Sequence, residues 1–383
     1  MFLNADRVTK RSNFTVQNRI KSVHITLAPS SRICYIEGMN FLATYVHSLD
    51  PVILDIPGTP LALRWYGLSY VAGFVLGYLV LLWMSRRKLY CVEEEKLGDF
   101  ITSVCIFGVL CGGRLGEFFF YWLPEYGWAG IVNDLAFVWG EWTQGHFTLP
   151  WVFRVWEGGM ASHGGIIGVL CVGLYWCYRH KWNALQVTDG LAIVSSLGIC
   201  FGRIANFING ELWGRITDSA IGVKFPTELA TLPTETQAEV LGAVEQVTQT
   251  PFRELMQQGE YYMDTLLRLC REMPQVQEVV AAAVPARYPS QLFESFGEGA
   301  LIFAVLFTLR LVWKKAPAGI FSALFAFMYA AARITCEAFK EPDAGVWYGI
   351  TEGQWLSFGI VVIGIVFLVF ALRNMKRGAA EAV

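Results

Sequence analysis

The stretch Ser357–Leu372 reads SFGIVVIGIVFLVFAL and contains no charged residue. A helix can cross a lipid bilayer when about 20 consecutive residues are mostly apolar. This stretch belongs to such a run, residues 354–373, and six similar runs precede it, at residues 65–84, 100–122, 160–178, 188–208, 290–313 and 318–338. The sequence therefore predicts an all-α polytopic membrane protein with seven transmembrane helices.

The composition of the 383 residues supports this fold class. Hydrophobic residues make up 54% and charged residues 16%, whereas soluble domains carry about a quarter of charged residues. The aromatic content of 15% excludes a disordered chain, and the net charge of −2 gives no electrostatic footprint for nucleic acid. The nine cysteines include no C-x-x-C pair, so neither a disulfide framework nor a zinc site is expected.

The basic residues predict the orientation, because Lys and Arg concentrate on the cytoplasmic side of a membrane. They follow the first, third, fifth and seventh runs, at Arg86, Arg87, Lys88, Arg179, Lys181, Lys314, Lys315, Arg373, Lys376 and Arg377. We therefore expect the N-terminus outside and the C-terminus in the cytoplasm. The basic segment 1–32 disagrees, so we interpret residues 1–38 as a non-functional extension, 39–377 as the membrane domain and 378–383 as a tail.

Residues 216–286 form a second non-membrane piece, between the fourth and fifth runs. Acidic residues outnumber basic ones there, and Tyr262, Leu266, Leu267 and Leu269 show helical periodicity. We expect a small, partly helical external subdomain, which would lie in the periplasm.

Polar residues near the ends of the apolar runs are the candidates for function, because charge inside a bilayer is costly. The fourth run ends in FGRIANFINGELWGR (201–215), in which Arg203, Asn206 and Asn209 share one helical face. This face predicts either a seam of hydrogen bonds between helices or a pocket for an anion, since guanidinium matches phosphate geometry.

The sixth run carries Tyr329, Arg333 and Glu337 at intervals of four residues. Arg333 and Glu337 either form a structural pair, or Arg333 joins an arginine of another span around a phosphate. In the fifth run Glu294 and Glu298 stand four residues apart and would repel each other. At least one of them is expected to pair with an arginine of another helix.

The third run opens with EGGMASHGGIIG (157–168), which places His163 among glycines that allow a helix or ligand to approach closely. His163 is either a packing residue or a general base, because imidazole titrates near neutral pH. Tyr66 in RWYG is either an aromatic residue of the membrane interface or a substrate contact. Arg114 and Glu117 in GGRLGE form either a simple pair or part of the site.

These sequence motifs together resemble those of the bacterial prolipoprotein diacylglyceryl transferase family. The resemblance rests on GRIANFINGELWGR, GGMASHGG, RYPSQLFE and RITCEAFKEPDAG, with RWYG and GGRLG upstream, and covers residues 39–377 except most of 216–286. The sequence departs from the family pattern at Lys340, where arginine is usual, at Ser162, where phenylalanine is common, and at Ala205, where glycine is common.

The resemblance implies an activity and a location. Such enzymes transfer the diacylglyceryl group of phosphatidylglycerol to the lipobox cysteine thiol of prolipoproteins, forming a thioether and releasing glycerol phosphate. They have seven transmembrane helices with a periplasmic head, lie in the bacterial inner membrane with the active site facing the periplasm, and need no metal or cofactor.

The resemblance also assigns roles to residues. Arg203 and Arg333 would bind phosphatidylglycerol and act in catalysis, and His163 would be the base. With Asn209 added from the polar face of the fourth run, the expected substrate-binding residues are Tyr66, Asn206, Asn209, Glu211, Gly214, Tyr329 and Glu337. A transporter for an anionic solute is the rival interpretation and would predict an inverted repeat, which the sequence does not show. A third interpretation is a non-catalytic lipid-binding scaffold.

Overall fold

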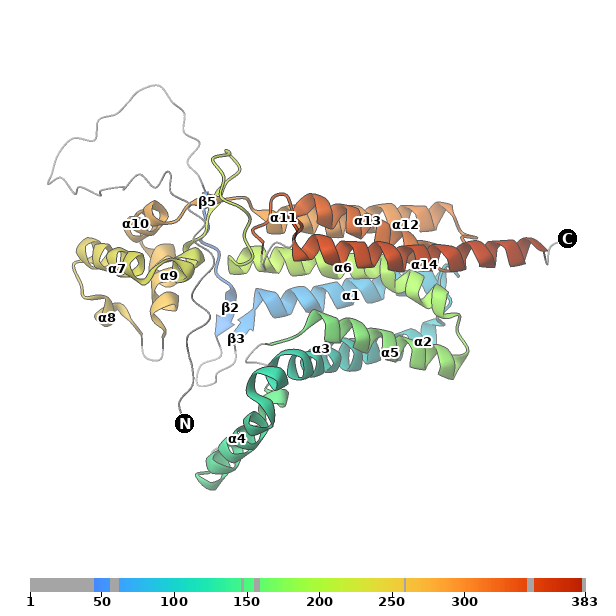
Figure 1. The fold of residues 1–383 in the computed structure, drawn as a ribbon, viewed down its shortest axis with the longest axis horizontal. Helices are drawn as coiled ribbons and strands as arrows, with labels where there is room; N and C mark the ends of the chain where they lie inside the picture. The colour runs from blue at the N-terminus through green and yellow to red at the C-terminus, as the bar shows by residue number, and fades with distance from the viewer. Residues whose placement is uncertain are drawn as a thin grey trace, which may run out of the picture. The chain divides into compact units, whose positions relative to one another are not determined.

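The structure is a computed structural model that describes residues 45–55, 62–145, 148–154, 159–257, 260–342 and 348–380. The proposed extension, residues 1–38, lies outside this part of the chain, as do residues 381–383 of the tail. Helices make up most of the described residues (Figure 1). The prediction of an all-α polytopic membrane protein is therefore confirmed at the level of fold class.

Five helices in the described ranges are long and apolar enough to cross a membrane. They are α1 (Trp65–Arg86), a continuous helix over Glu94–Thr143, α6 (Ala184–Asn209), the helix Ser290–Val312 and the segment Glu352–Lys376 of α14 (Glu352–Ala380). The two other predicted spans are helical as well, as α5 (Ser162–His180) and α13 (Ile320–Cys336), of which α13 has only 17 residues. Each predicted run thus contains a helix, and the number of crossings stays a prediction.

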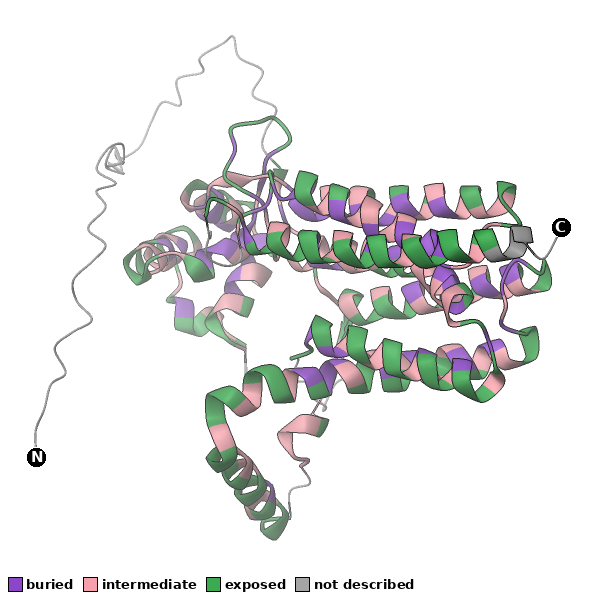
Figure 2. Ribbon diagram, turned by 45° about the vertical axis from the view of Figure 1, so that its right-hand side comes forward, coloured by how far each residue is buried: buried purple, intermediate pink, exposed green. Residues whose placement is uncertain are grey.

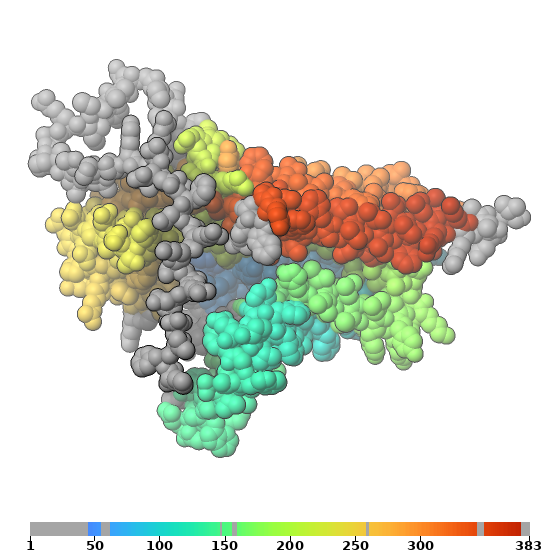
Figure 3. Space-filling view, in the orientation of Figure 1, coloured from blue at the N-terminus to red at the C-terminus, as the bar shows by residue number. Residues whose placement is uncertain are grey.

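The long helix Glu94–Thr143 continues beyond residue 122, where we expected a connector. It consists of α2 (Glu94–Ser103), the π-helical η1 (Val104–Cys111), α3 (Gly112–Glu117), the π-helical η2 (Phe118–Trp122) and α4 (Leu123–Thr143). Gly127 has a φ of 62°, which kinks the helix. Beyond the kink α4 extends away from the other helices and exposes Trp128, Val132 and Trp139 (Figure 3).

The fifth predicted span is also composite and lies against α6. It comprises α11 (Ser290–Glu294), the π-helical η6 (Ser295–Ala300) and α12 (Leu301–Val312). In the bundle α6 contacts α1, η6 and α13, while α14 packs along α13 (Figure 1). The helix α6 is therefore the element that joins the residues of the candidate site.

Glycines allow α3 and α5 to cross in close contact, as the glycine-rich start of the third run led us to expect. A Cβ atom added to Gly164 would lie 2.5 Å from the Cα atom of Gly116, and one added to Gly168 would lie 3.0 Å from that of Gly112. Side chains larger than hydrogen would separate the two helices.

The bundle buries a core and leaves apolar side chains on its outer faces. Leu81, Phe100 and Phe321 are almost fully buried, whereas Val71 on α1 and Val362 on α14 are exposed. Figure 2 shows that the exposed residues follow the outer faces of the helices. Exposed apolar surface over the length of several helices is typical of a surface that faces lipid.

Asp189 is a buried charge in α6 that the sequence analysis did not single out. Its carboxylate accepts hydrogen bonds of 2.8 Å from the backbone N–H groups of Gly319 and Ser322 and from the Ser322 hydroxyl. These N–H groups belong to the first turn of α13, which lacks intrahelical partners for them. Asp189 therefore caps α13 and ties it to α6.

Residues 216–286 form short strands and helices with a hydrophobic core of their own, and we call this segment the head. Its elements are β4 (Val223–Lys224), the 3-10 helix η5 (Pro226–Thr231), α7 (Thr234–Thr248), α8 (Phe252–Leu255), α9 (Tyr262–Glu272), α10 (Pro274–Ala283) and, at its end, β5 (Ala286–Arg287). The predicted helix at Tyr262 is confirmed, since Leu266 and Leu269 of α9 lie in the head core.

Strands connect the head to the beginning of the described chain. β1 (Tyr45–Val46) pairs in parallel with β4, and β5 pairs with β4 antiparallel. β2 (Val52–Asp55) and β3 (Ala62–Arg64) form an antiparallel pair directly before α1. The helices α7–α10 gather at the end of the bundle at which α6 ends (Figure 1).

Candidate functional site

Arg203 lies in the last two turns of α6 and is ion-paired with two glutamates of the neighbouring helix. Its Nε atom is 2.8 Å from Oε2 of Glu294, and its Nη2 atom is 3.7 Å from Oε2 of Glu298. Glu294 and Glu298 are 1% and 0% exposed, respectively. The Ser295 hydroxyl donates a 3.0 Å hydrogen bond to the Cys200 carbonyl, which holds the two helices together at this level.

Arg333 of α13 reaches the same two glutamates. Its Nη1 atom is 3.3 Å from Oε1 of Glu294 and 3.5 Å from Oε1 of Glu298. Its Nη2 atom is 3.2 Å from Oε2 of Glu337, one turn further along α13. The expected pairing of the fifth-run glutamates with arginines of other helices is thus confirmed, and Arg203 and Arg333 face one cluster.

This cluster, made of Arg203, Arg333, Glu294, Glu298 and Glu337, is the largest feature of the candidate site. It contains two guanidinium groups and three carboxylates, a formal charge of −1 when all are ionised. Buried carboxylates are stabilised only when they are paired or hydrogen-bonded. The glutamates are stabilised by the arginines, and in return they fix the orientation of both guanidinium planes.

The cluster is closed on one side by α14. A Cβ atom added to Gly353 would lie 2.7 Å from Oε2 of Glu337 and 3.1 Å from Nη2 of Arg333. The first turn of α14 therefore contacts the Arg333–Glu337 pair through a residue without a side chain.

Glu211, just beyond the end of α6, is held by the two asparagines of the polar face. Its Oε1 atom accepts a 2.7 Å hydrogen bond from Nδ2 of Asn206 and a weaker one, 3.4 Å, from Nδ2 of Asn209. Its backbone carbonyl accepts a 2.6 Å bond from Nε2 of Gln291, which is fully buried in α11. The polar face predicted from the spacing is therefore a hydrogen-bonded unit around one carboxylate.

Gly214 lies where three segments of backbone meet. Its N–H group donates a 2.9 Å bond to the Tyr288 carbonyl, and an added Cβ atom would lie 2.4 Å from the Phe339 carbonyl oxygen. Arg287 donates a 3.0 Å bond to the Gly214 carbonyl. The close packing of these backbone segments thus leaves no room for a side chain at residue 214.

Lys340, one of the three departures from the family pattern, is buried and lies where the same backbone segments meet. The Arg215 Nε atom donates a 2.9 Å bond to the Lys340 carbonyl. Next to it Arg287 is ion-paired with Glu228 at 2.6 Å and with Glu341 at 3.0 Å. Burial alone would lower the pKa of Arg287, but the two carboxylates outweigh that effect and raise its pKa.

Tyr66 and Tyr329 lie within electrostatic reach of the cluster. The Tyr66 phenol, at the start of α1, interacts with the charges of Glu211 and Arg203, and its ring lies 5.3 Å from that of Tyr70. The Tyr329 phenol, on α13, interacts with the charges of Arg203 and Arg333. Tyr66 thus lies within reach of Arg203, and Tyr329 within reach of both arginines.

His163 is placed differently. It lies in the first turn of α5 with an exposed side chain, and it has no hydrogen bond or ion pair to any other residue that the structure describes. Helix α5 packs against η1 and α3. Among the described residues, the ion pairs of the arginine–glutamate cluster involve no residue of α5.

Arg114 of α3 is buried and bonded to the backbone that precedes α5. It is 3% exposed, and its guanidinium donates to the carbonyls of Val152 and Gly159 at 3.0 and 2.8 Å. It also lies 3.9 Å from the ring of Trp151. Arg114 thus connects the second span to the backbone segment before α5, the helix that begins next to His163.

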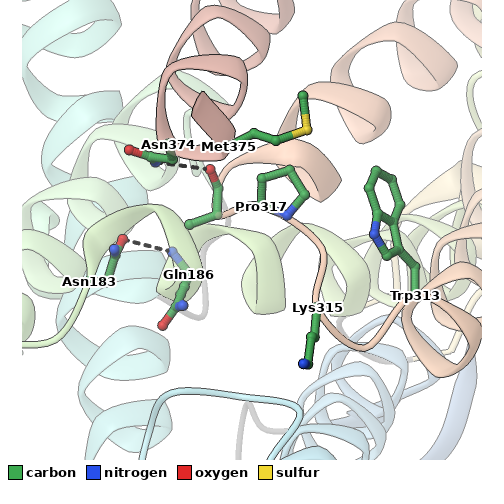
Figure 4. A pocket seen from close by; sticks show the side chains of 8 residues that line it. Asn183, Gln186, Trp313, Lys315, Pro317, Asn374 and Met375 are labelled. Carbon is green, nitrogen blue, oxygen red and sulfur yellow. Dashed lines mark hydrogen bonds between the residues drawn. The ribbon is translucent and has the colours of Figure 1, made fainter. Parts of the chain in front are cut away.

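A cavity of about 550 Å³ opens far from this cluster, between the start of α6 and the end of α14 (Figure 4). Its lining includes Gln186 and Asn374, with Lys315 at one side. Gln186 precedes Arg203 by 17 residues on the same helix, about 26 Å at 1.5 Å per residue. The cavity therefore lies at the opposite end of the bundle from the candidate site.

The family model described as prolipoprotein diacylglyceryl transferase matches residues 51–370. The chain belongs to the prolipoprotein diacylglyceryl transferase family.

Several relatives are similar in sequence to this chain along nearly their whole length, and each bears the name phosphatidylglycerol–prolipoprotein diacylglyceryl transferase. The protein of Bdellovibrio bacteriovorus is 37% identical over 350 residues, covering 86% of this chain and 94% of the relative. That of Proteus mirabilis is 35% identical over 334 residues, with the same two shares. That of Burkholderia thailandensis is 33% identical over 345 residues, covering 88% and 98%.

Membership in the prolipoprotein diacylglyceryl transferase family makes the chain a membrane enzyme, a transferase of lipoprotein biosynthesis. This confirms the resemblance found in the sequence and decides against the transporter and the scaffold. The cluster and the Glu211 unit are accordingly the candidate active site of a member of this transferase family.

Sequence reasoning missed two sets of residues that the structure adds to the site of this transferase. It expected at least one of Glu294 and Glu298 to pair with an arginine of another helix but did not include either in the site, whereas they bridge both site arginines. It did not consider Gln291 or Gly353, which contact Glu211 and the Arg333–Glu337 pair. The spacing of Gln291, Glu294 and Glu298 along one helix was the available signal, since it places them on one face.

Proposed function

We propose that this transferase moves the diacylglyceryl group of phosphatidylglycerol to the lipobox cysteine thiol of a prolipoprotein, with Arg203 and Arg333 as its phosphate-binding and catalytic arginines. A thioether forms between the thiol sulfur and the glycerol carbon, and glycerol phosphate leaves. The observation that carries the proposal is that two helices direct guanidinium groups to the same two buried glutamates, 2.8–3.7 Å away.

The arginines would act on the departing phosphate. When the carbon–oxygen bond breaks, negative charge grows on the phosphate oxygens, and fixed cationic donors in a water-poor site stabilise it. Because the glutamates already hold both guanidinium planes, little reorganisation is needed when the substrate arrives. Guanidinium is suited to this role since it presents several donors in a rigid fork.

The negative formal charge of the cluster has a consequence for substrate binding. A phosphate oxygen must replace a carboxylate contact at one arginine, or the added negative charge would be repelled. The contacts of Glu298, at 3.5 and 3.7 Å, are longer than the 2.8 Å contact of Glu294 with Arg203. We infer that the phosphate displaces Glu298 from the arginines and leaves Glu294 in place.

The thiol must lose its proton, because thiolate rather than thiol is the nucleophile. His163 is our candidate for the base, and its exposed position at the start of α5 leaves its imidazole open to a substrate. The alternative is that the field of the arginines alone stabilises the thiolate and that His163 only shapes the pocket.

The remaining predicted residues would bind the substrates around this centre. Tyr66 and Tyr329 border the arginines, Glu337 orients Arg333, and Gly214 supports the turn next to the site. Asn206 and Asn209 hold Glu211, whose carboxylate would contact the glycerol or the peptide. No metal or cofactor enters this mechanism.

We further propose that the protein crosses the bacterial inner membrane seven times, with the N-terminus outside and the C-terminus in the cytoplasm. The domain of residues 39–377 would then carry its head, residues 216–286, in the periplasm. Support comes from the basic residues at the opposite end of the bundle and from the position of the cluster, on the half of α6 nearest the head. The active site would open toward the periplasmic side.

The experiment mixes purified enzyme with phosphatidylglycerol and a peptide that carries a lipobox cysteine, and it measures thioether formation by mass spectrometry. Arg203→Ala and Arg333→Ala should each reduce the rate by about 100-fold or more, the usual loss when a preorganised donor is removed. Arg86→Ala is the matched control, because Arg86 pairs with Glu94 at an exposed position. Full activity of either Arg203→Ala or Arg333→Ala would contradict the proposal.

A further inference from the structure

His47 is a buried histidine at the junction of the head and the membrane helices, and neither the motifs nor the arginine cluster include it. It follows β1 directly, and its backbone N–H donates a 2.8 Å bond to the Lys224 carbonyl of β4. The residue is 5% exposed. Its ring contacts those of Phe207 and Phe225, with both centroids at 5.3 Å, so that its orientation is fixed by packing.

The imidazole is hydrogen-bonded to the backbone of Phe207. Its Nε2 atom has no hydrogen-bond partner among the described residues, and Nδ1 is the ring nitrogen that faces Gly210 at the end of α6, so we assign the bond to Nδ1. Phe207 is two residues before the end of α6, and its carbonyl, which has two lone pairs, also accepts a 2.9 Å bond from the N–H group of Gly210. His47 therefore adds a second donor to the last turn of the helix that carries Arg203.

Gly210, which ends α6, is held from the same side. It adopts a left-handed conformation with a φ of 66°, and the Thr227 hydroxyl donates to its carbonyl. A Cβ atom on Gly210 would lie 3.3 Å from Nδ1 of His47 and 3.1 Å from Oγ1 of Thr227. The histidine and the threonine thus pack directly on the residue that stands between Asn209 and Glu211.

We propose that His47 is a positioning residue, which through Phe207 and Gly210 holds Asn209 and Glu211 in the geometry that binds substrate. The inference rests on the proposed substrate-binding role of Glu211. His47 itself would contact no reacting atom. It would instead orient the backbone segment that carries the substrate-binding residues. A misplacement of a binding group by about 1 Å can cost up to about 100-fold in rate.

The neutral imidazole suits this role. Burial lowers the pKa of His47 to about 4, the bond to Phe207 opposes this shift, and the charge of Arg271 adds to it. Near neutral pH the ring is therefore uncharged, with a proton on Nδ1 for the Phe207 carbonyl. A small cavity of about 30 Å³ borders the ring and is also lined by Asn209 and Arg271.

The test compares three substitutions that separate the two nitrogens from the volume of the ring. His47→Asn keeps a donor close to the position of Nδ1, His47→Gln places its amide near Nε2, and His47→Phe keeps an aromatic ring without a donor. We expect His47→Phe and His47→Gln to lower kcat/KM for phosphatidylglycerol by about tenfold or more. His47→Asn should restore most of the activity.

Two further measurements show whether His47 acts through Glu211. In a Glu211→Gln background His47→Phe should cause no additional loss, because residues that act as a unit are not additive. His180→Phe is the matched control, since His180 stacks on both Trp176 and Trp182 with centroids at 4.9 Å and is the last residue of α5. It should leave the rate unchanged.

The outcomes distinguish the two proposals. If Glu211→Gln is impaired but His47→Asn is as poor as His47→Phe, or if the two losses multiply, His47 does not position the site and this inference is wrong. If Glu211→Gln is fully active, the substrate-binding role of Glu211 fails first, and the inference that depends on it fails with it.

Discussion

Gly299 of η6 lies directly against Cys200 of α6. A Cβ atom on Gly299 would be 2.6 Å from both the Cα and the Cβ atom of Cys200, closer than two carbon atoms can approach without bonding. Glu298 precedes this contact, and Arg203 follows it by less than one turn. The distance between the arginine and the glutamates is therefore set by the absence of a side chain at residue 299.

Gly299→Ala should consequently weaken both the fold and the reaction. The added methyl group must push η6 away from α6, and overpacking of this kind costs about 1–3 kcal/mol. The shift would also lengthen the contacts between Arg203 and Glu294. We expect a lower midpoint of thermal unfolding in detergent and a lower kcat. Gly98→Ala is the control, because nothing lies within 4 Å of a Cβ atom there; an equal loss in both variants would contradict this account.

The two bridging glutamates should differ in their effect on the enzyme. Glu294 contacts Arg203 through Oε2 at 2.8 Å and Arg333 through Oε1 at 3.3 Å, so Glu294→Gln, which has a single side-chain oxygen, loses one of these contacts and the negative charge. We expect kcat/KM to fall by about 100-fold or more, since breaking a buried ion pair costs about 3–5 kcal/mol.

Glu298→Gln should be milder, and it should lower KM for phosphatidylglycerol. The substitution removes a negative charge that, on our proposal, the phosphate must displace from the arginines. Steady-state kinetics with the lipid as the varied substrate separates kcat from KM. The proposal is wrong if Glu298→Gln raises KM more than Glu294→Gln does.

His163→Gln tests the base. If His163 removes the thiol proton, its loss should slow turnover by about 100-fold or more at neutral pH. Raising the pH should partly restore the rate, because a cysteine thiol ionises without help near pH 8.5. The measurement is the pH dependence of kcat/KM in the parent enzyme and the variant. A pH profile of unchanged shape would favour a role in shaping the pocket.

Much of the membrane fold could be predicted from the sequence, because apolar runs of sufficient length reflect a single physical requirement. Each of the seven runs contains a helix, and the pair Arg333–Glu337 followed from its spacing of four residues. The continuation of the helix beyond residue 122 was not predicted, because Gly127 kinks the chain there without ending the helix. A kinked helix and a loop with the same residues have similar hydrophobic patterns.

The partners across the site could not be predicted in the same way. Periodicity shows which face of a helix a residue occupies, but not which helix lies opposite. Glu294 is 91 residues from Arg203 and 39 from Arg333 in the sequence, and the packing of α11 on α6 and α13 brings them together. His47 illustrates the limit most clearly, because its contacts Phe207 and Phe225 lie far along the chain.

The burial of His47 also predicts how stability depends on pH. Its pKa is about 4 in the folded protein, against 6.5 for an ordinary histidine. Between these values the unfolded chain binds a proton that the folded chain does not, so the free energy of unfolding falls as the pH falls through this window. A difference of this size corresponds to a loss on the order of 3 kcal/mol at pH 4. Above about pH 6.5 the effect is absent.

The measurement is thermal unfolding in detergent at pH 7 and pH 5, for the parent enzyme and for His47→Asn. The charged group that acts on the imidazole is Arg271, which pairs with Asp50 at 3.2 Å. The pKa of the nearby Cys270 thiol is raised by burial to about 12, so it stays protonated. All of these remain in the variant, and only the imidazole is lost. The midpoint of thermal unfolding should therefore fall more between pH 7 and pH 5 in the parent enzyme than in His47→Asn. Equal decreases would mean that His47 is not buried in its neutral form.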